Sequence, residues 1–279
     1  MKMINETAIV TGSTSGIGKK IAELFLKEGC KVAICSRSET NVNQTVAEFK
    51  KNFGDSVIGM PCDVRDPTAV KNLIKKTYDT FGSIRILVAN AGLNLTYGPF
   101  QYLTLDAVNS DAETIIGTNL IGVLNCISAV LPHMVEKNYG RIITLSGAGA
   151  DRPQENLTIY SASKGGVVAF SRCIAKEFEM EDKDIKINIF QPGMILTNLY
   201  NISLIKIWKD QEDFDYQMDL IKEHVMVDIE KSCKTVIPYS LPSCKKNGKY
   251  FRGYSLIKLI RGYMKVSKEM KRMNSTKNA

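Results

Sequence analysis

A tyrosine and a lysine stand one helical turn apart in the segment YSASK, residues 160 to 164. Positions i and i+4 share one face of a helix, so the ammonium of Lys164 can lie near the phenol of Tyr160. An unperturbed tyrosine has a pKa of about 10 and is a poor base at neutral pH. A positive charge about 5 Å away in a partly buried site favours the phenolate by roughly 3 kcal/mol. The pair therefore predicts a tyrosine that acts as a general acid or base.

A glycine-rich turn, TGSTSGIG at residues 11 to 18, directly follows the first apolar run of the chain. Its glycines permit a tight turn and a close approach of the backbone to a pyrophosphate, while N–H groups at the start of the next helix face the anion. An isolated turn of this kind also fits a plain connection between a strand and a helix. Its position after the first strand favours dinucleotide binding. The predicted contacts are Gly12, Ser15, Gly16, Ile17 and Gly18.

Apolar, β-branched runs predict the strands that must position these motifs. The runs fall at residues 7–12, 31–37, 56–64, 84–92, 141–147 and 185–193. Helix-length segments lie between them, at residues 16–28, 39–53, 67–82, 106–137 and 157–182. This alternation predicts an α/β fold, a single Rossmann-type doubly wound parallel sheet of about seven strands with helices on both faces. Ligands of such sheets bind beyond the carboxyl ends of the strands, where the motifs fall.

Taken in order, the motifs resemble those of the short-chain dehydrogenase/reductase family over residues 4 to about 200. The glycine spacing is T-G-x-x-x-G-x-G, Tyr160 and Lys164 match the Y-x-x-x-K pair, and Asn119 matches the asparagine of the catalytic helix. In the turn ANAG, residues 89 to 92, Ala89 replaces the first asparagine of the family. The resemblance implies further cofactor contacts by Asp63, Val64, Asn90, Ala91, Gly92, Pro192, Gly193, Ile195 and Thr197.

The resemblance also implies a mechanism. Tyr160 would protonate a carbonyl oxygen as hydride arrives from a nicotinamide, or deprotonate an alcohol in reverse. Lys164 would lower the pKa of the phenol and bind the nicotinamide ribose. Asn119 would hold a water that links Lys164 to solvent. An isolated Y-x-x-x-K pair also occurs on ordinary amphipathic helices, but here the other motifs would have to be accidental as well.

The hydroxyl that usually holds the substrate oxygen in this family stands thirteen residues before the tyrosine, and that position is Gly147 here. Ser146 is the neighbouring residue. Because a strand turns its side chains to opposite faces at each step, Ser146 reaches the substrate only if the backbone bends. The nearby glycines Gly147 and Gly149 favour such a bend, so Ser146 is the predicted catalytic hydroxyl. The alternative is a serine that only caps the end of the strand.

The end of the second strand distinguishes the two nicotinamide cofactors. Family members that prefer NAD place an aspartate there, whereas this chain has Ser36 followed by Arg37. A carboxylate would repel a 2′-phosphate, and an arginine offers it a planar, bidentate donor. The sequence therefore predicts NADP(H) in preference to NAD(H). The alternative is that Arg37 is an ordinary surface charge.

Composition and charge exclude several other classes of protein. Hydrophobic residues make up 44% of the chain and charged residues 24%, which is typical of a globular protein. Residues 243–279 contain eleven Lys or Arg and the single acid Glu269, so this tail has a net charge of +10. The whole chain has a net charge of +8, so residues 1–242 have a net charge of −2. The tail has no finger, zipper or RNA-binding motif, so no nucleic-acid partner is expected.

Seven scattered cysteines without a C-x-x-C pair predict reduced thiols, and only two histidines leave no predicted metal site. The start of the chain has too short an apolar run for a signal peptide. The sequence has no uninterrupted run of 18 apolar residues, so we expect no integral membrane segment. We expect a cytoplasmic protein. A homodimer or homotetramer is implied by the resemblance alone.

We interpret residues 1–260 as one catalytic domain that binds a dinucleotide, with residues 194–227 over the substrate and residues 261–279 as a basic extension. Leu199, Tyr200 and Trp208 could line an apolar lid, or belong to a helix packed on its own domain. The resemblance places the last strand at residues 252–259. The apolar residues that follow have helical spacing, and we interpret the tail as a solvated basic helix; the alternative is that it docks on the body, a second subunit or an anionic membrane.

The predicted function is an NADP-dependent oxidoreductase acting on a small-molecule carbonyl or secondary alcohol. The alternative is a non-catalytic dinucleotide-binding protein with the same fold and a role in regulation or assembly, which the offset of Ser146 favours. A sugar epimerase or dehydratase of the related longer enzymes fits the glycine spacing and the small substrate region less well.

Overall fold

Seven parallel strands form the central sheet of the computed structural model, which describes residues 1–197, 206–207 and 211–277 of the 279-residue chain. Their order is β3-β2-β1-β4-β6-β7-β9, and each neighbouring pair is parallel. The strands are β1 (Thr7–Thr11), β2 (Lys31–Ser36), β3 (Val57–Pro61), β4 (Ile86–Ala89), β6 (Gly140–Leu145), β7 (Ile185–Gln191) and β9 (Tyr250–Arg252). The doubly wound sheet predicted from the sequence is confirmed.

The central strands are buried on both faces, which explains their continuous apolar sequences. Every residue of β1, β4 and β6 is buried. In the register of the sheet, Ile9 of β1 pairs with Ala33 of β2 on one side and with Leu87 of β4 on the other. The strand order reverses at β1, so a crevice for a ligand opens beyond the carboxyl ends of β1 and β4.

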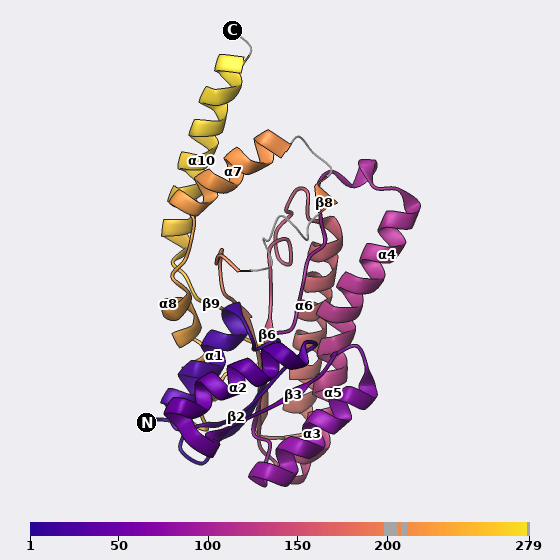
Figure 1. Cartoon of the computed structure of the whole chain (residues 1–279), viewed down its shortest axis with the longest axis vertical. Helices are drawn as coiled ribbons and strands as arrows, with labels where there is room; N and C mark the ends of the chain where they lie inside the picture. Colours follow the sequence, from indigo (N-terminus) through magenta and orange to yellow (C-terminus); the bar gives the residue numbers. More distant parts are fainter. Residues whose placement is uncertain (198–205, 208–210, 278–279) are drawn as a thin grey trace.

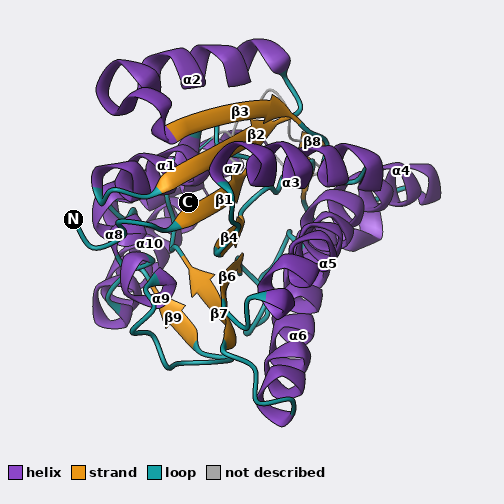
Figure 2. Ribbon diagram, turned by 90° about the horizontal axis from the view of Figure 1, so that it is seen from below, coloured by secondary structure: helices purple, strands orange, loops and turns teal. Residues whose placement is uncertain are grey.

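Helices cover both faces of this sheet, as Figure 2 shows. One apolar core packs the sheet against α3 (Pro67–Phe81), α5 (Gly122–Glu136) and α6 (Thr158–Met180). The second core packs the other face against α1 (Gly16–Lys27), α2 (Glu39–Phe53), α8 (Ile229–Lys234) and α9 (Ile237–Ser240). Two layers of helices therefore enclose the strands, and the carboxyl edge of the sheet stays available for a ligand.

The helix predicted over residues 106–137 consists of α4 (Leu105–Ile116), a π-turn (Gly117–Ile121) and α5. By length and composition the whole run, Leu105–Glu136, could cross a membrane. Of its most apolar stretch, 44% is buried inside the protein, and the core helix of a soluble protein meets the same criterion. The sequence expectation therefore overlooked one apolar helix, and the absence of an integral membrane segment stays a prediction.

The last strand predicted over residues 252–259 is wrong except for its first residue. The strand β9 ends at Arg252, and α10 (Leu256–Lys277) begins where the prediction continued the strand. Phe251 anchors the short strand, since its ring stacks on Tyr239 at 3.7 Å between ring centres and on Phe190 at 5.2 Å. The apolar residues after Leu256 recur at helical spacing, so they form a helix that leads away from the sheet (Figure 1).

A small second sheet lies over the carboxyl edge of the main one. It pairs β5 (Thr96–Tyr97) with β8 (Lys206–Ile207). Two 3-10 turns, Gly54–Ser56 and Phe100–Tyr102, and the helix α7 (Gln211–His224) complete the described elements. The predicted lid residues Leu199, Tyr200 and Trp208 lie outside the described residues.

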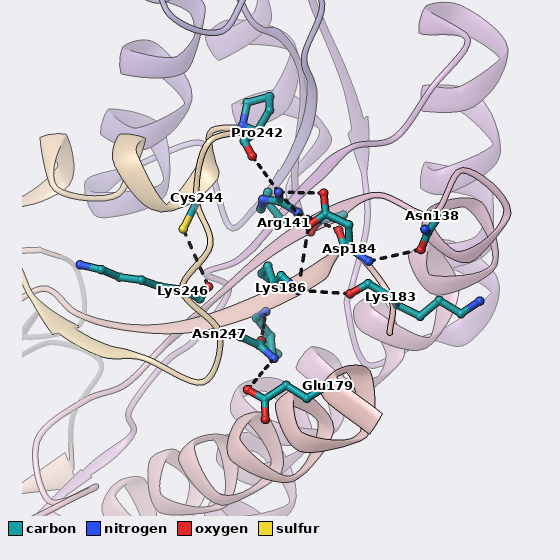
Figure 3. A network of polar contacts seen from close by, with 12 residues as sticks. Asn138, Arg141, Glu179, Lys183, Asp184, Lys186, Pro242, Cys244, Lys246 and Asn247 are labelled. Carbon is teal, nitrogen blue, oxygen red and sulfur yellow. Dashed lines mark hydrogen bonds and ion pairs between the residues drawn. The ribbon is translucent and has the colours of Figure 1, made fainter. Parts of the chain in front are cut away.

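A buried arginine ties together the amino ends of β6 and β7, at the edge of the sheet opposite the predicted site (Figure 3). Arg141 is fully buried. Its guanidinium donates to the carbonyls of Gly140 and Asp184, both at 2.8 Å, and of Leu241 and Pro242, at 3.2 and 3.0 Å. It also forms an ion pair with the Asp184 carboxylate at 3.2 Å. These bonds compensate the buried charge and fix the segment that leads to β9.

Candidate active site

The glycine turn after β1 has the backbone that its sequence predicts. Gly12 and Gly16 have φ angles of +62° and +53°, a left-handed conformation that favours glycine. A Cβ atom on Gly18 would lie 2.4 Å from the carbonyl oxygen of Gly12 and from Nδ2 of Asn90. That amide Nδ2 donates to the carbonyls of Thr11 and Gly12 at 2.8 and 3.0 Å. The turn is therefore held against the end of β4.

Two hydroxyls that the sequence interpretation did not single out complete this turn. Thr11 Oγ1 accepts the backbone N–H groups of Asn90 and Ala91, both at 3.0 Å. Ser13 is fully buried, and its Oγ donates to Val10 O and accepts from Cys35 N at 3.0 Å. The sequence signal for these contacts was the presence of short hydroxyl residues beside the glycines. A hydroxyl buried at a turn needs hydrogen-bond partners, and the backbone groups of the turn provide them.

The start of α1 fits an anionic group. No side chain caps its first turn, and the residues of that turn, Ser15 to Gly18, line a cavity. Uncapped N–H groups and the positive end of the helix dipole therefore face the cavity. Thr197 closes this cleft from the other side, since a Cβ atom on Gly16 would lie 3.1 Å from its Cγ2. The segment after β7 thus reaches back to the glycine turn, as the predicted nicotinamide side must.

Four predicted residues lie at the ends of β2 and β3. Arg37 is exposed directly after Ser36, and Val64 is buried. The carboxylate of Asp63 forms a 2.6 Å ion pair with Arg65, which sequence reasoning missed. The hydrogen bond from Arg65 lowers the pKa of Asp63, and the nearby charge of Arg37 lowers it further. The structure therefore brings Arg37 and Asp63 to the same end of the crevice.

Tyr160 and Lys164 lie together on one face of α6, and both are buried, with exposed fractions of 7% and 4%. The Lys164 ammonium is 5.9 Å from the centre of the Tyr160 ring and donates to Leu145 O at 3.1 Å. Burial lowers the pKa of Lys164 to about 8. The lysine therefore still carries its charge at neutral pH, and at this distance the charge favours the phenolate.

Asn119 lies in the π-turn between α4 and α5 and is fully buried. Its side chain accepts from Leu93 N at 2.8 Å and donates to Leu93 O at 2.9 Å and to Ser163 Oγ at 3.0 Å. A Cβ atom on Gly92 would lie 3.2 Å from Asn119 Oδ1 and 3.4 Å from Lys164 Nζ. The structure thus brings the asparagine and the lysine to the same space beside Gly92, and a water there stays a prediction.

The hydroxyl of Ser146 is bonded to another side chain, although Ser146 also lines the cavity beside Tyr160, so its catalytic role stays a prediction. Its Oγ lies 3.0 Å from the hydroxyl of Tyr250, which donates to Gln191 Oε1 at 2.7 Å. The residue that faces the phenol of Tyr160 is Gly147, where a Cβ atom would lie 2.5 Å from the hydroxyl. The alternation of side chains along β6 continues into these two residues and sends Ser146 toward β9.

The remaining predicted residues follow β7. Gly193 has a φ angle of +87°, and a Cβ atom there would lie 2.7 Å from the ring of Tyr254. The carbonyl of Pro192 accepts a 2.7 Å bond from Ser232 Oγ, and Ile195 is buried. These contacts hold the segment after β7 between the sheet and the start of α10.

One cavity of about 910 Å³ joins these parts. It is lined by the glycine turn, Tyr160, Lys164 and the segment after β7, together with Ser146 and Gly147. Its lining also includes residues that the sequence interpretation missed, in the loop at 151–154 and along α10. A pocket of this size accommodates a dinucleotide and the reacting part of a substrate.

The sequence profile described as short chain dehydrogenase matches residues 6–203. The chain belongs to the short-chain dehydrogenase family. It is 36% identical over 207 residues to the (2S)-[(R)-hydroxy(phenyl)methyl]succinyl-CoA dehydrogenase subunit BbsD of Thauera aromatica, with 72% of this chain and 77% of that protein covered. It is 34% identical over 195 residues to chlorophyll(ide) b reductase NOL of Arabidopsis thaliana, where the match covers 68% of this chain and 55% of the plant protein.

Solved structures of short-chain dehydrogenases share the fold. An actinorhodin polyketide ketoreductase with NADPH has a TM-score of 0.75 at 28% identity, with 88% of this chain and 95% of that chain covered. A 3-ketoacyl-(acyl-carrier-protein) reductase from Brucella melitensis complexed with NADH has a TM-score of 0.76 at 23% identity, with 90% and 97% covered. Membership in this family of oxidoreductases agrees with the glycine turn and the tyrosine–lysine pair described above.

Proposed function

We propose that the protein is an NADP-dependent oxidoreductase that transfers a hydride between the nicotinamide and a carbonyl or secondary alcohol, with Tyr160 as general acid and base. One observation carries the proposal. The buried pair Tyr160 and Lys164, 5.9 Å apart, lines the same cavity as the uncapped glycine turn. Nicotinamide chemistry and proton transfer can therefore meet in one cavity.

When bound, the nicotinamide supplies or accepts the hydride, and the chain's own residues handle the proton. In reduction, the hydroxyl of Tyr160 gives its proton to the carbonyl oxygen; in oxidation, the phenolate removes the proton of the alcohol. The charge of Lys164 stabilises the phenolate, and its bond to Leu145 O fixes the position of that charge. Burial of both side chains limits the access of water and strengthens this interaction.

Asn119 has a positioning role in this proposal. Its three side-chain bonds hold the loop after β4 and the helix α6 at a constant separation. Gly92 has no side chain to fill the space beside the Asn119 oxygen and the Lys164 ammonium. That space suits the water through which Lys164 would recover a proton from solvent.

The preference for NADP(H) is supported by the end of β2. Arg37 is exposed there, Ser36 precedes it, and the nearby carboxylate of Asp63 is already paired with Arg65. A 2′-phosphate would therefore meet a guanidinium rather than an unpaired acid. The related structures hold both cofactors, NADPH in the ketoreductase and NADH in the Brucella reductase, so affinity for this chain has to be measured directly.

A second candidate function is a non-catalytic dinucleotide-binding protein, and Gly147 is the observation that favours it. At this position the chain has no hydroxyl to hold a substrate oxygen. Cofactor binding alone does not separate the two functions, because both require it. Turnover separates them.

The experiment is a panel of ketosugars, 3-oxoacyl thioesters, quinones and steroids, offered with NADPH or NADH while the nicotinamide absorbance is followed. We expect NADPH to be consumed with at least one carbonyl class and to bind more tightly than NADH. Consumption of neither cofactor with any class, at cofactor concentrations that saturate binding, would favour the non-catalytic protein. The cytoplasmic location and the homodimeric or homotetrameric state stay predictions from the sequence.

A further inference from the structure

One face of α10 lines the catalytic cavity, and its chemistry changes along the helix. The lining residues recur at intervals of three and four, which places them on a single stripe. The first half of the stripe is apolar and the second half is cationic. Its principal members are Leu259, Ile260, Tyr263, Met264, Lys268 and Lys271.

The apolar half of this stripe begins beside the segment that follows β7. Gly253, just before the helix, donates to Gln191 O at 2.9 Å, and the ring of Tyr254 packs over Gly193. From there α10 leads away from the sheet (Figure 1). At a rise of about 1.5 Å per residue, Lys271 lies about 18 Å further along the helix than Leu259. The cationic half is therefore the end remote from Tyr160.

Contacts with α7 hold α10 in this orientation. A Cβ atom on Gly262 would lie 2.3 Å from the carbonyl oxygen of His224, so the two helices approach closely there. Val266 is buried in a cluster with Phe214. His224 Nε2 lies 3.1 Å from Glu269 Oε1. Leu259 packs against this cluster as well, whereas Ile260 and the later residues of the stripe lie outside it and line the cavity.

Apolar side chains of the stripe remain partly open to solvent at the cavity. The exposed fractions are 48% for Ile260, 41% for Tyr263 and 67% for Met264. A contiguous apolar surface that continues a catalytic cavity is suited to cover an apolar part of a ligand.

The charges of the lining select the sign of the ligand. Among the described lining residues, the cationic side chains are Arg152, Lys164, Arg252, Lys268 and Lys271, and the one acid is Asp151. Asp151 lies 3.5 Å from Arg252, so its charge is compensated within the lining. An anionic group is therefore favoured at the remote end, where Lys268 and Lys271 of the helix belong to the described lining.

We propose that the substrate is an elongated anionic amphiphile. Its carbonyl or hydroxyl group lies at Tyr160, its apolar chain follows Leu259 to Met264, and its anionic group, a phosphate or a carboxylate, binds Lys268 and Lys271. This inference rests on the proposed oxidoreductase function and adds the class of substrate. It gives the basic C-terminal extension a role in substrate recognition.

The test measures binding of three probes to the full-length protein saturated with NADP⁺, by calorimetry below the micelle concentration. The probes are dodecyl phosphate, dodecanoate and 1-dodecanol, which share a chain and differ in the head group. We expect the better of the two anionic probes to bind about tenfold more tightly than the alcohol, because two partly exposed ion pairs contribute roughly that much. The comparison of phosphate with carboxylate identifies the preferred anion.

Two double variants make the test specific. Lys268→Gln with Lys271→Gln is expected to remove the preference for the anionic probe and leave the affinity for 1-dodecanol unchanged. The matched control, Lys258→Gln with Lys265→Gln, makes the same charge change on the same helix at exposed positions outside the lining. It is expected to keep the preference.

Three results would overturn the inference. They are equal affinity of the wild type for all three probes, an equal loss of preference in the control variant, and binding of anionic phosphatidylserine vesicles that depends on Lys258 and Lys265. The last result would assign α10 to a membrane surface instead. Turnover of a neutral carbonyl by the Lys268 and Lys271 double variant is measured as well. This measurement tests the oxidoreductase function independently of the binding of an anionic group. If no carbonyl is turned over while the anion preference holds, the oxidoreductase function fails and the binding site stands.

Discussion

The hydroxyl of Tyr160 lies against the backbone of Gly147, where a Cβ atom would be only 2.5 Å away. At the position where the family usually carries a hydroxyl, this chain has a glycine. The phenol of Tyr160 fills the space that a side chain there would need. Ser146, one residue earlier, bonds to Tyr250 instead. We infer that the proton step uses Tyr160 without a serine from the end of β6.

Gly147→Ser is therefore expected to lower turnover by about 10²-fold, because the added Cβ displaces the phenol from its reacting position. The measurement is kcat with the best carbonyl of the panel. Gly165→Ser is the control, since a Cβ atom there would meet only Ala150 O, at 3.9 Å. A rise in turnover in Gly147→Ser would show that the site lacks a hydroxyl that it needs.

Ser146→Ala is expected to change turnover less than about threefold, although the sequence interpretation assigned this residue the catalytic hydroxyl. The substitution removes a partly buried hydrogen bond and should lower the free energy of unfolding by about 1 kcal/mol. Denaturant unfolding and kcat are measured on the same preparations. Tyr250→Phe removes the partner of that bond, and the double variant should show coupling between the two. A loss of turnover near 10²-fold in Ser146→Ala would restore the predicted role.

Lys164→Met is expected to abolish turnover while raising the free energy of unfolding of the cofactor-free protein at pH 7. Burial lowers the pKa of Lys164 from 10.5 to about 8, which corresponds to a cost of order 3 kcal/mol for keeping the buried amine charged. Above pH 10.5 the amine is neutral in both the folded and the unfolded protein, so it adds no cost to folding. The cost grows as the pH falls below 10.5 and is complete below about pH 8. The stability difference between variant and wild type should therefore be largest below pH 8 and shrink toward pH 10.5.

The same series isolates Lys164 from the other titrating groups, because they are common to both proteins. Unfolding is followed by denaturant titration at several pH values between 7 and 10.5. A pH-independent difference would contradict the lowered pKa of Lys164.

Arg37→Asp is expected to weaken NADPH binding by about 10²-fold, since it removes a charge-assisted donor and places a carboxylate near the 2′-phosphate. NADH binding should change little or improve. Dissociation constants for both cofactors are compared in the wild type and the variant, with Arg172→Asp, at an exposed position outside the cavity lining, as a control for net charge. Equal losses for NADPH and NADH would mean that Arg37 does not read the phosphate.

Much of the fold was predictable from local patterns. Strands such as β1 and β6 are buried on both faces, so their sequences are continuously apolar, and the glycine turn needs left-handed residues that the sequence displays as Gly12 and Gly16. The pairing of Tyr160 with Lys164 also follows from helical spacing alone. In each case the information lies within a few neighbouring residues.

The remaining features depend on contacts between distant segments. The direction of Ser146 is fixed by Tyr250, 104 positions later in the chain. The helical spacing of α10 was visible in the sequence, but its orientation depends on Gly262 meeting His224. The spacing alone could not distinguish a helix lining the cavity from a solvated basic tail. The predicted contacts of Leu199, Tyr200 and Trp208 lie outside the described residues.

The central claim is that Tyr160 exchanges the proton with the reacting oxygen. It is tested most directly by Tyr160→Phe, which removes the hydroxyl and keeps the ring. With the best carbonyl and saturating NADPH, we predict that kcat falls by at least about 10²-fold, whereas the dissociation constant of NADPH stays within about threefold of the wild type. Turnover at the wild-type rate, with the cofactor bound as tightly, would contradict the claim.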